Sequence, residues 1–369
     1  MKFSVSSGDF LKALTVASGA LAQNAVMPIT EDFLLELSGN TLTIKTTNLN
    51  QTVITETTVI GGEDGQMAVA GKILLETIKN LPEQPVTLQH DEITGVIEIL
   101  SSAGKFKLAG DDPSDFPELE EEQSTQSITL SSDYLIEALN NTYFATSHDE
   151  ARTAMMGILM QVDFNKVNFV ATDAHRLVKH TITEIPSDLT ASIILPQKPM
   201  VYLKNVLPPE EDVEISFNNS HAYFKFGNTQ LVTRLIDAQF PDYNLVIPYD
   251  NEFSLRVDRK NLLNTLKRIA IYSNKSTNQV VFNIQDGALT LHAQDIDFSN
   301  EATEQVPCSF DGEEMSMGLN GKFVIEMLSS LHSEEVVFKL SRPNRAGLLY
   351  PGEQAPNVEV LMLLMPVMR

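Results

Sequence analysis

The sequence predicts an α+β protein made of three copies of one unit, each with two helices on one face of antiparallel strands. A helical pattern recurs at a period of about 125 residues. Alternating apolar strands flank the helices in every copy, and each copy ends on an apolar residue followed by proline: Phe116-Pro117, Phe240-Pro241 and Met365-Pro366. Several features in one register indicate a triplication.

Composition sets the first limits. The chain has 369 residues, too many for one ordinary core, and its 43% hydrophobic and 20% charged content is that of a globular protein. A single cysteine, Cys308, excludes a disulfide framework and a cysteine-based zinc site, and it fits a reducing compartment. The N-terminus shows no apolar signal-peptide region. We therefore expect a cytoplasmic protein with no membrane association.

The formal charge of −23 argues against a protein that simply coats nucleic acid, whose binding face is usually basic. It does not exclude a locally basic face, because the distribution of charge matters more than its sum. The charge pattern of the helices must decide between these alternatives.

The first helix of each unit follows an alternating strand. The apolar residues at helical spacing are Phe10, Leu11 and Leu14, then Leu135, Ile136 and Leu139, then Leu262, Leu263 and Leu266. Asp9, Asp133 and Asp258 stand at or just before the helix starts, where a carboxylate can cap free N–H groups. The preceding strands are marked by Phe3 and Val5, Ile128 and Leu130, and Phe253 and Leu255.

The second helices are predicted at residues 72–82, 198–208 and 322–331. Each begins with a lysine. An alternating strand follows each, marked by Val86 and Leu88, by Val213, Ile215 and Phe217, and by Val336, Phe338 and Leu340.

These repeats predict domains at residues 1–122, 126–248 and 251–369, joined by an acidic run at 118–123 and by residues 248–252. The last stretch, 358–369, is almost unbroken apolar sequence, too short to span a bilayer. It predicts a strand buried on both faces. Because Pro366 has no N–H for a ladder, this strand should stop there or run along a sheet edge.

The whole chain resembles the bacterial sliding clamp family, the β subunit of DNA polymerase III. The most specific stretches are Ala-Thr-Asp-Ala-His-Arg-Leu at 171–177, Phe-Pro-Asp-Tyr at 240–243, and the Met-Pro tail. The resemblance implies three DNA-clamp domains per chain and a head-to-tail homodimeric ring, with helices inside and sheets outside, around duplex DNA. It implies no enzymatic activity and no cofactor. The implied partners are double-stranded DNA, the polymerase III catalytic subunit, the clamp loader, other polymerases and repair proteins that carry a clamp-binding motif, and a second copy of the chain.

The resemblance also implies three sets of site residues. DNA-binding residues are Lys12, Asn24, Lys72, Lys79, Lys198, Lys204, Lys267, Arg268 and Lys322. A groove for partner peptides is formed by Met155, Thr172, Ala174, His175, Arg176, Leu177, Pro241, Val246, Leu363, Met365, Pro366 and Met368. The dimer interface joins Lys105, Phe106 and Lys107 to Ile271, Tyr272, Glu301 and Glu304. The family commonly has arginine at Asn24 and glycine at Ala174, and Val367 is an extra residue.

Two other functions stay open at this point. A cytosolic hydrolase could use His148, Asp149 and His175, although these residues lack metal-ligand spacing and the chain has no phosphate loop, nucleophile elbow or dinucleotide turn. A monomeric adaptor could bind peptides without enclosing DNA. Substitution of the histidines tests the first alternative, and the mass in solution tests the second.

Overall fold

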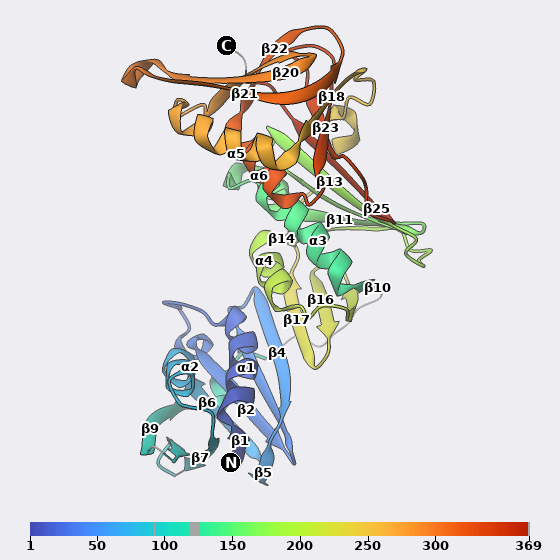
Figure 1. Cartoon of the computed structure of the whole chain (residues 1–369). Helices are drawn as coiled ribbons and strands as arrows, with labels where there is room; N and C mark the ends of the chain where they lie inside the picture. Colours follow the sequence, from blue (N-terminus) through green and yellow to red (C-terminus); the bar gives the residue numbers. More distant parts are fainter. Residues whose placement is uncertain (92, 103, 119–125, 368–369) are drawn as a thin grey trace. The chain divides into compact units, whose positions relative to one another are not determined.

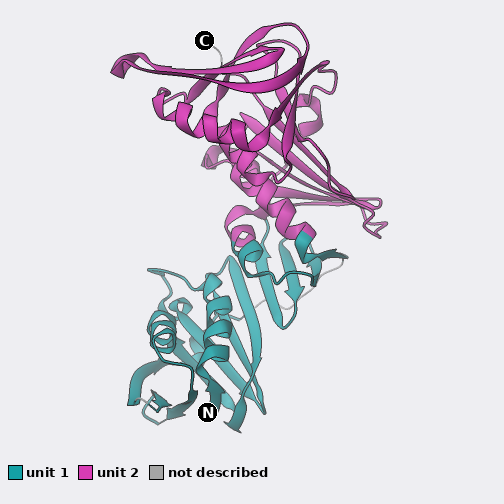
Figure 2. Cartoon of the chain, in the orientation of Figure 1, with its two compact units in different colours: residues 1–133, 202–235 teal, residues 134–201, 236–369 magenta. Residues whose placement is uncertain are grey.

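The computed structural model describes residues 1–91, 93–102, 104–118 and 126–367, so most of the predicted acidic linker lies outside the described residues. The chain forms two compact units: residues 1–133 with 202–235, and residues 134–201 with 236–369 (Figure 2). Each unit is built on one large antiparallel sheet.

Unit 1 holds a sheet of 13 strands in the order β10-β15-β16-β17-β4-β3-β2-β6-β9-β8-β7-β1-β5 (Figure 1). Helices α1 (Ser7–Ala17) and α2 (Gly71–Lys79) pack on it over a core that includes Phe3, Phe10, Leu14, Leu74 and Ile78. The strands are β1 (Lys2–Ser6), β2 (Asp32–Ser38), β3 (Thr41–Thr47), β4 (Gln51–Thr58), β5 (Ile60–Glu63), β6 (Gly65–Ala70), β7 (Pro85–Asp91), β8 (Val96–Ser101), β9 (Gly104–Asp111), β10 (Gln126–Ser131), β15 (Asp212–Phe217), β16 (His221–Phe226) and β17 (Thr229–Arg234).

Unit 2 holds a sheet of 12 strands in the order β14-β11-β12-β13-β25-β24-β23-β18-β21-β20-β19-β22. Its helices are α5 (Arg259–Ile269) and α6 (Gly321–Ser330), with most of α3 (Ser132–Thr142) and the first half of α4 (Gln197–Val206). The strands are β11 (Gly157–Asp163), β12 (Lys166–Thr172), β13 (Arg176–Thr183), β14 (Ala191–Pro196), β18 (Phe253–Asp258), β19 (Gln279–Gln285), β20 (Gly287–Asp295), β21 (Asn300–Asp311), β22 (Met315–Asn320), β23 (Glu335–Leu340), β24 (Gly347–Pro351) and β25 (Val358–Leu364).

The α+β prediction is confirmed, and each predicted strand and helix is present. Asp258 caps α5 by accepting a hydrogen bond from the Asn261 N–H at 2.6 Å. At α1 the cap is instead the hydroxyl of Ser6, which accepts from the Asp9 N–H at 3.4 Å. Asp9 therefore lies in the first turn, where its charge favours the helix dipole but does not form the cap.

The middle repeat contributes strands to both sheets. β17 pairs with β4, Thr229 opposite Thr55, so β10 and β15–β17 extend the sheet of the first repeat. β13 pairs with β25 from Arg176 opposite Leu364 to Ile182 opposite Val358, so β11–β14 extend the sheet of the last repeat. Hydrogen bonds thus run across repeat boundaries, and for this reason the compact units do not coincide with the repeats.

The final strand behaves as its sequence predicts. Val358, Val360 and the residues from Leu361 to Leu364 are buried, and the strand ends at Leu364, ahead of Pro366. Within the described residues, no helix is long and apolar enough to cross a membrane.

Candidate functional site

A tight turn between β12 and β13 carries several residues of the predicted peptide groove. The Thr172 hydroxyl accepts from the Ala174 N–H at 3.1 Å and donates to the Arg176 carbonyl at 2.6 Å. The Asp173 carboxylate accepts from the N–H groups of His175 and Arg176 at 2.9 and 3.0 Å. Ala174 has a φ of +73°, a left-handed conformation that costs a residue with a Cβ about 1–2 kcal/mol.

The side chain of Arg176 holds this turn against the helices. This side chain is 7% exposed, and its guanidinium pairs with Asp173 at 3.0 Å and with Glu326 of α6. It also donates to the Phe144 carbonyl and stacks over the Phe323 ring at 4.2 Å. All three guanidinium nitrogens are therefore hydrogen-bonded, and Arg176 ties the turn to α6 and to the backbone at Phe144.

Leu177 lies on the other face of β13, because successive strand residues alternate. It faces Leu363 of β25, both are 2% exposed, and they join one apolar cluster with Tyr243 and Ile247. The Met365 N–H donates to the His175 carbonyl at 2.9 Å, which brings the exposed end of the tail beside the turn. The structure buries Thr172, Arg176, Leu177 and Leu363, half-buries Met155 and Pro366, and exposes Ala174, His175, Pro241, Val246 and Met365. Met368 lies outside the described residues.

Tyr243 and Lys179 also belong to this face, and the sequence analysis assigned neither to a site. Tyr243 is buried and donates its hydroxyl to Gln161 Oε1 at 2.8 Å. The Lys179 ammonium lies 5.8 Å from the centre of the Tyr243 ring. The available signal was strand alternation: Lys179 follows Leu177 by two residues and so shares its face.

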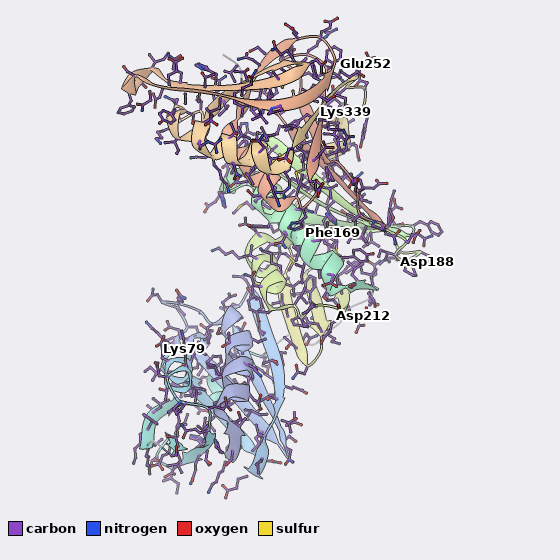
Figure 3. All side chains as sticks on the ribbon, in the orientation of Figure 1. Lys79, Phe169, Asp188, Asp212, Glu252 and Lys339 are labelled. Atoms are coloured by element: carbon purple, nitrogen blue, oxygen red, sulfur yellow. The ribbon has the colours of Figure 1, made fainter. Side chains whose placement is uncertain are left out.

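The predicted DNA-binding cations sit mainly on helices. Lys12, Lys72, Lys79, Lys198, Lys267 and Lys322 are exposed on them, and Lys79 projects from α2 in Figure 3. Lys204 is half-buried, and burial lowers the pKa of its ammonium. Asn24 is an exposed loop residue with a φ of +52°. Two of these cations have carboxylate partners: Glu304 accepts from the Arg268 Nε at 2.9 Å, and the exposed Lys12 ammonium lies 3.7 Å from the Asp9 carboxylate.

The predicted dimer residues of β9 and β21 lie where these strands have an unpaired edge among the described residues. β9 pairs with β6 only at Gly110 and Asp111, and β21 pairs with β18 only from Cys308 onward, which leaves 104–109 and 300–307 with one open side each. Lys105 and Lys107 both contact Glu98, at 2.5 and 3.1 Å, and hold the pKa of that carboxyl below its ordinary value.

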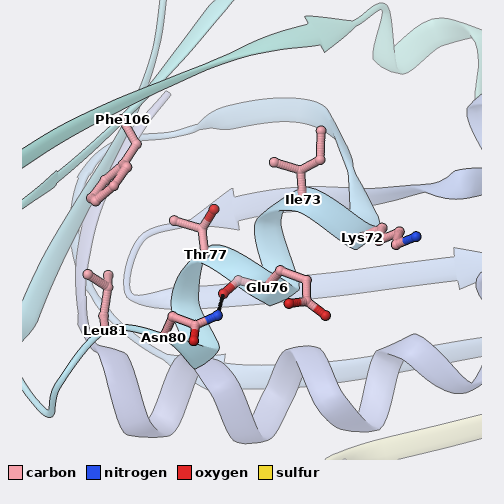
Figure 4. Close-up of a pocket in the computed structure, with 7 residues that line it drawn as sticks. All are labelled: Lys72, Ile73, Glu76, Thr77, Asn80, Leu81 and Phe106. Atoms are coloured by element: carbon pink, nitrogen blue, oxygen red, sulfur yellow. Dashed lines mark hydrogen bonds between the residues drawn. The ribbon is translucent and has the colours of Figure 1, made fainter.

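Phe106 is 37% exposed and lines a pocket of about 660 Å³ between β9 and α2 (Figure 4). This edge pocket is lined by Lys72, Ile73, Glu76, Thr77, Asn80, Leu81 and Phe106. In unit 2, Ile271 and Tyr272 are 65% and 42% exposed in the short 3-10 helix Ala270–Tyr272 that follows α5. Each unit therefore carries apolar surface beside its open edge.

The residues of the hydrolase alternative do not form one cluster of metal ligands among the described residues. Asp149 caps a short helix by accepting from the Ala151 N–H at 3.0 Å, and it pairs with Arg152 at 3.4 Å. His175 is exposed on the turn, and His148 lines a separate pocket beside Arg176. Across the described part of the chain, no group of three or more histidine, cysteine, aspartate or glutamate residues could hold a metal ion.

Comparison with known proteins follows the same three-part division. Models for the N-terminal, central and C-terminal domains of the DNA polymerase III beta subunit match residues 1–120, 129–242 and 244–368. The beta sliding clamp of Vibrio cholerae is 28% identical, with all of both chains covered. A sliding clamp from Pseudomonas aeruginosa bound to griselimycin has the same fold, with a TM-score of 0.95, 24% identity and full coverage of both chains. A clamp from Bartonella birtlesii, also bound to griselimycin, has a TM-score of 0.93 and 29% identity over all of both chains.

Proposed function

The chain belongs to the family of the DNA polymerase III beta subunit, and from this premise we propose how it encloses DNA and holds its partners. It is a DNA sliding clamp, a non-catalytic processivity factor. A clamp linked to DNA keeps a bound polymerase at high effective concentration near the template, so each rebinding step becomes intramolecular. The observation that carries the proposal is the match of three clamp domains to the three repeats.

For the DNA, we propose that the exposed helix lysines bind phosphates without reading sequence. Lys72 and Lys79 lie about two turns apart on α2 and so share a face. Such binding is salt-dependent, which permits sliding. Exchanging Lys12, Lys79 and Lys322 for glutamine should reduce the salt slope of DNA binding by about one for each phosphate that is no longer neutralised. Lys166 of β12, outside the helices, supplies a control substitution.

For ring closure, we propose that the open edge of β9 meets the open edge of β21 from a second copy. Two identical heterologous contacts close a dimer, and a covered edge no longer invites aggregation. The edge pocket then receives Ile271 and Tyr272 of the second copy. Phe106→Ala should weaken the dimer about 30-fold or more, the effect expected for an aromatic anchor worth at least about 2 kcal/mol. Sedimentation velocity measures this, with the exposed Ile60 of β5 changed to alanine as control.

For partners, we propose that the groove beside the 172–176 turn takes short extended peptides with leucine or phenylalanine anchors. The polymerase III catalytic subunit, the clamp loader, and other polymerases and repair proteins would present such peptides. The buried leucine pair provides a desolvated floor, and exposed Met365 adapts to different anchors. Fluorescence binding of an anchor peptide should weaken for Met365→Asp and not for Val26→Asp, a fully exposed residue of unit 1.

Retention on DNA tests the whole proposal. The protein is loaded on nicked circles by a cognate loader with ATP, and the circles are then linearised. Retention on circles with release from free ends supports topological linkage. Equal retention on circles and linear DNA indicates ordinary surface binding and contradicts the ring, and a protomer mass in solution favours the adaptor.

A further inference from the structure

Besides the two pockets already described, another pocket opens on the sheet face that carries the peptide groove. It encloses about 330 Å³ in unit 2, and Lys179, Thr181, Tyr249, Tyr350, Glu359 and Leu361 are among its lining residues. We call it the tyrosine pocket. Lys179 pairs across the sheet with Leu361, while Leu177 pairs with Leu363. The tyrosine pocket therefore lies two residues along both strands from the leucine pair of the groove, a distance of about 7 Å.

The Lys179 ammonium is a positive charge in this pocket that has no carboxylate partner among the described residues. Burial lowers its pKa, and no carboxylate of the described residues lies within 4.0 Å of it, so within that part of the chain its contact is with the Tyr243 ring. Other polar groups are already used: the Thr181 hydroxyl donates to Asn168 Oδ1 at 2.7 Å, and the Gln354 amide bonds both backbone groups of Val360. A half-buried cation without an anion gains from an incoming carboxylate.

We propose that the tyrosine pocket binds an acidic side chain of the partner peptide, two residues beyond an apolar anchor. The carboxylate pairs with Lys179, and the hydroxyls of Tyr249 and Tyr350, which line the same pocket, can donate to it. An extended peptide spans about 7 Å in two residues, which matches the separation of the two subsites. Charge complementarity and continuity with the groove both favour this occupant, and the inference rests on the proposed peptide-binding function.

Glu359 is the carboxylate among the lining residues, and it bears on the proposal. It lies opposite Thr181 on β25 and its side chain is exposed to solvent. It raises the pKa of Lys179 less than burial lowers it. Glu359 thus weakens, without cancelling, the attraction of the pocket for an anion, and its removal should strengthen that attraction.

The test uses two pairs of anchor peptides, and within each pair one peptide has glutamate where the other has glutamine. In the first pair this position lies two residues before the first anchor, and in the second pair it lies two residues after the last anchor. For one placement the glutamate peptide should bind the wild-type clamp about tenfold more tightly, and salt should reduce the gain. Lys179→Met, which keeps an unbranched apolar chain over Tyr243, should abolish the gain and leave the glutamine peptide unaffected. Lys225→Met, at an exposed lysine of β16 in unit 1, is the lysine control, and Glu359→Gln should preserve or increase the gain.

The outcomes separate this proposal from the groove itself. Equal binding of glutamate and glutamine peptides at both placements overturns the acidic subsite, as does a gain that persists in Lys179→Met or disappears in Glu359→Gln. If the glutamine peptide does not bind the wild-type clamp, or binds equally with its anchors changed to alanine, the peptide groove fails and the subsite fails with it.

Discussion

Replacing Arg176 with methionine should destabilise the β12–β13 turn strongly. The substitution keeps an unbranched chain but removes a guanidinium whose side chain is 7% exposed and whose partner Asp173 is 15% exposed. Breaking a buried pair by removing one partner costs about 3–5 kcal/mol. The second carboxylate, Glu326, is 47% exposed and can rehydrate, so we expect the lower end, about 3 kcal/mol.

Native-state hydrogen exchange is the suitable measurement, since a chain with several domains does not unfold in two states. Amides along the β13–β25 ladder that exchange by opening of this region should exchange about 100-fold faster in Arg176→Met. Arg176→Lys should fall between the two, because lysine keeps the charge but loses the planar fork. Arg345→Met removes an exposed ion pair with Asp250 and should have an effect under about 1 kcal/mol. Equal exchange in the Arg176 and Arg345 variants would refute the role assigned to the guanidinium.

Three further predictions concern single residues. Burial raises the pKa of Asp32 from 3.8 to about 7, and so does the hydrogen bond that the protonated Asp32 carboxyl donates to Asp111. Its stabilisation of unit 1 is therefore complete below about pH 4 and lost as pH rises through about 7, and urea unfolding of Asp32→Asn should lack this pH dependence. Burial lowers the pKa of His180 from 6.5 to about 4. The stabilisation of unit 2 by the neutral His180 is therefore present above about pH 6.5 and lost as pH falls through about 4. An NMR titration midpoint near 6.5 would contradict this. Ala174→Gly relieves the left-handed strain and should stabilise by up to about 1 kcal/mol, whereas Ala151→Gly should not, as differential thermal melting of the two variants can show.

The repeats and their elements could be predicted because they depend on local periodicity. Strands β1, β10 and β18 and the two helices of each repeat follow from apolar spacing alone. The cap of α1 was harder to place, since Ser6 and Asp9 both have suitable side chains and only the backbone geometry selects the hydroxyl. The division of the middle repeat between two sheets depends on pairing of strands far apart in sequence, which periodicity does not encode.

In the candidate site, too, contacts between residues far apart in the sequence could not be predicted from local patterns. Leu177 and Leu363 were assigned to the groove from the resemblance, and their pairing on one sheet face is consistent with that assignment. The resemblance also implies Arg176 as a groove residue, and the sequence alone does not predict that its guanidinium pairs with Glu326 of α6. The engagement of Arg268 by Glu304 joins a predicted DNA residue to a predicted dimer residue, and only the folded geometry reveals that ion pair.

The shared ladders of β17 with β4 and of β13 with β25 decide which fragments of this chain can be produced alone. A fragment that ends between residues 248 and 252 keeps β13 but loses β25, so the backbone from Arg176 to Ile182 loses its hydrogen-bond partners along one side. The middle repeat cut out alone would expose a second such edge at β17. Expression of single repeats should therefore give aggregated material, whereas division of the chain by sheet requires cuts at the 133–134, 201–202 and 235–236 junctions. The sequence thus consists of three tandem repeats, but its strands form two sheets, and the middle repeat belongs to both.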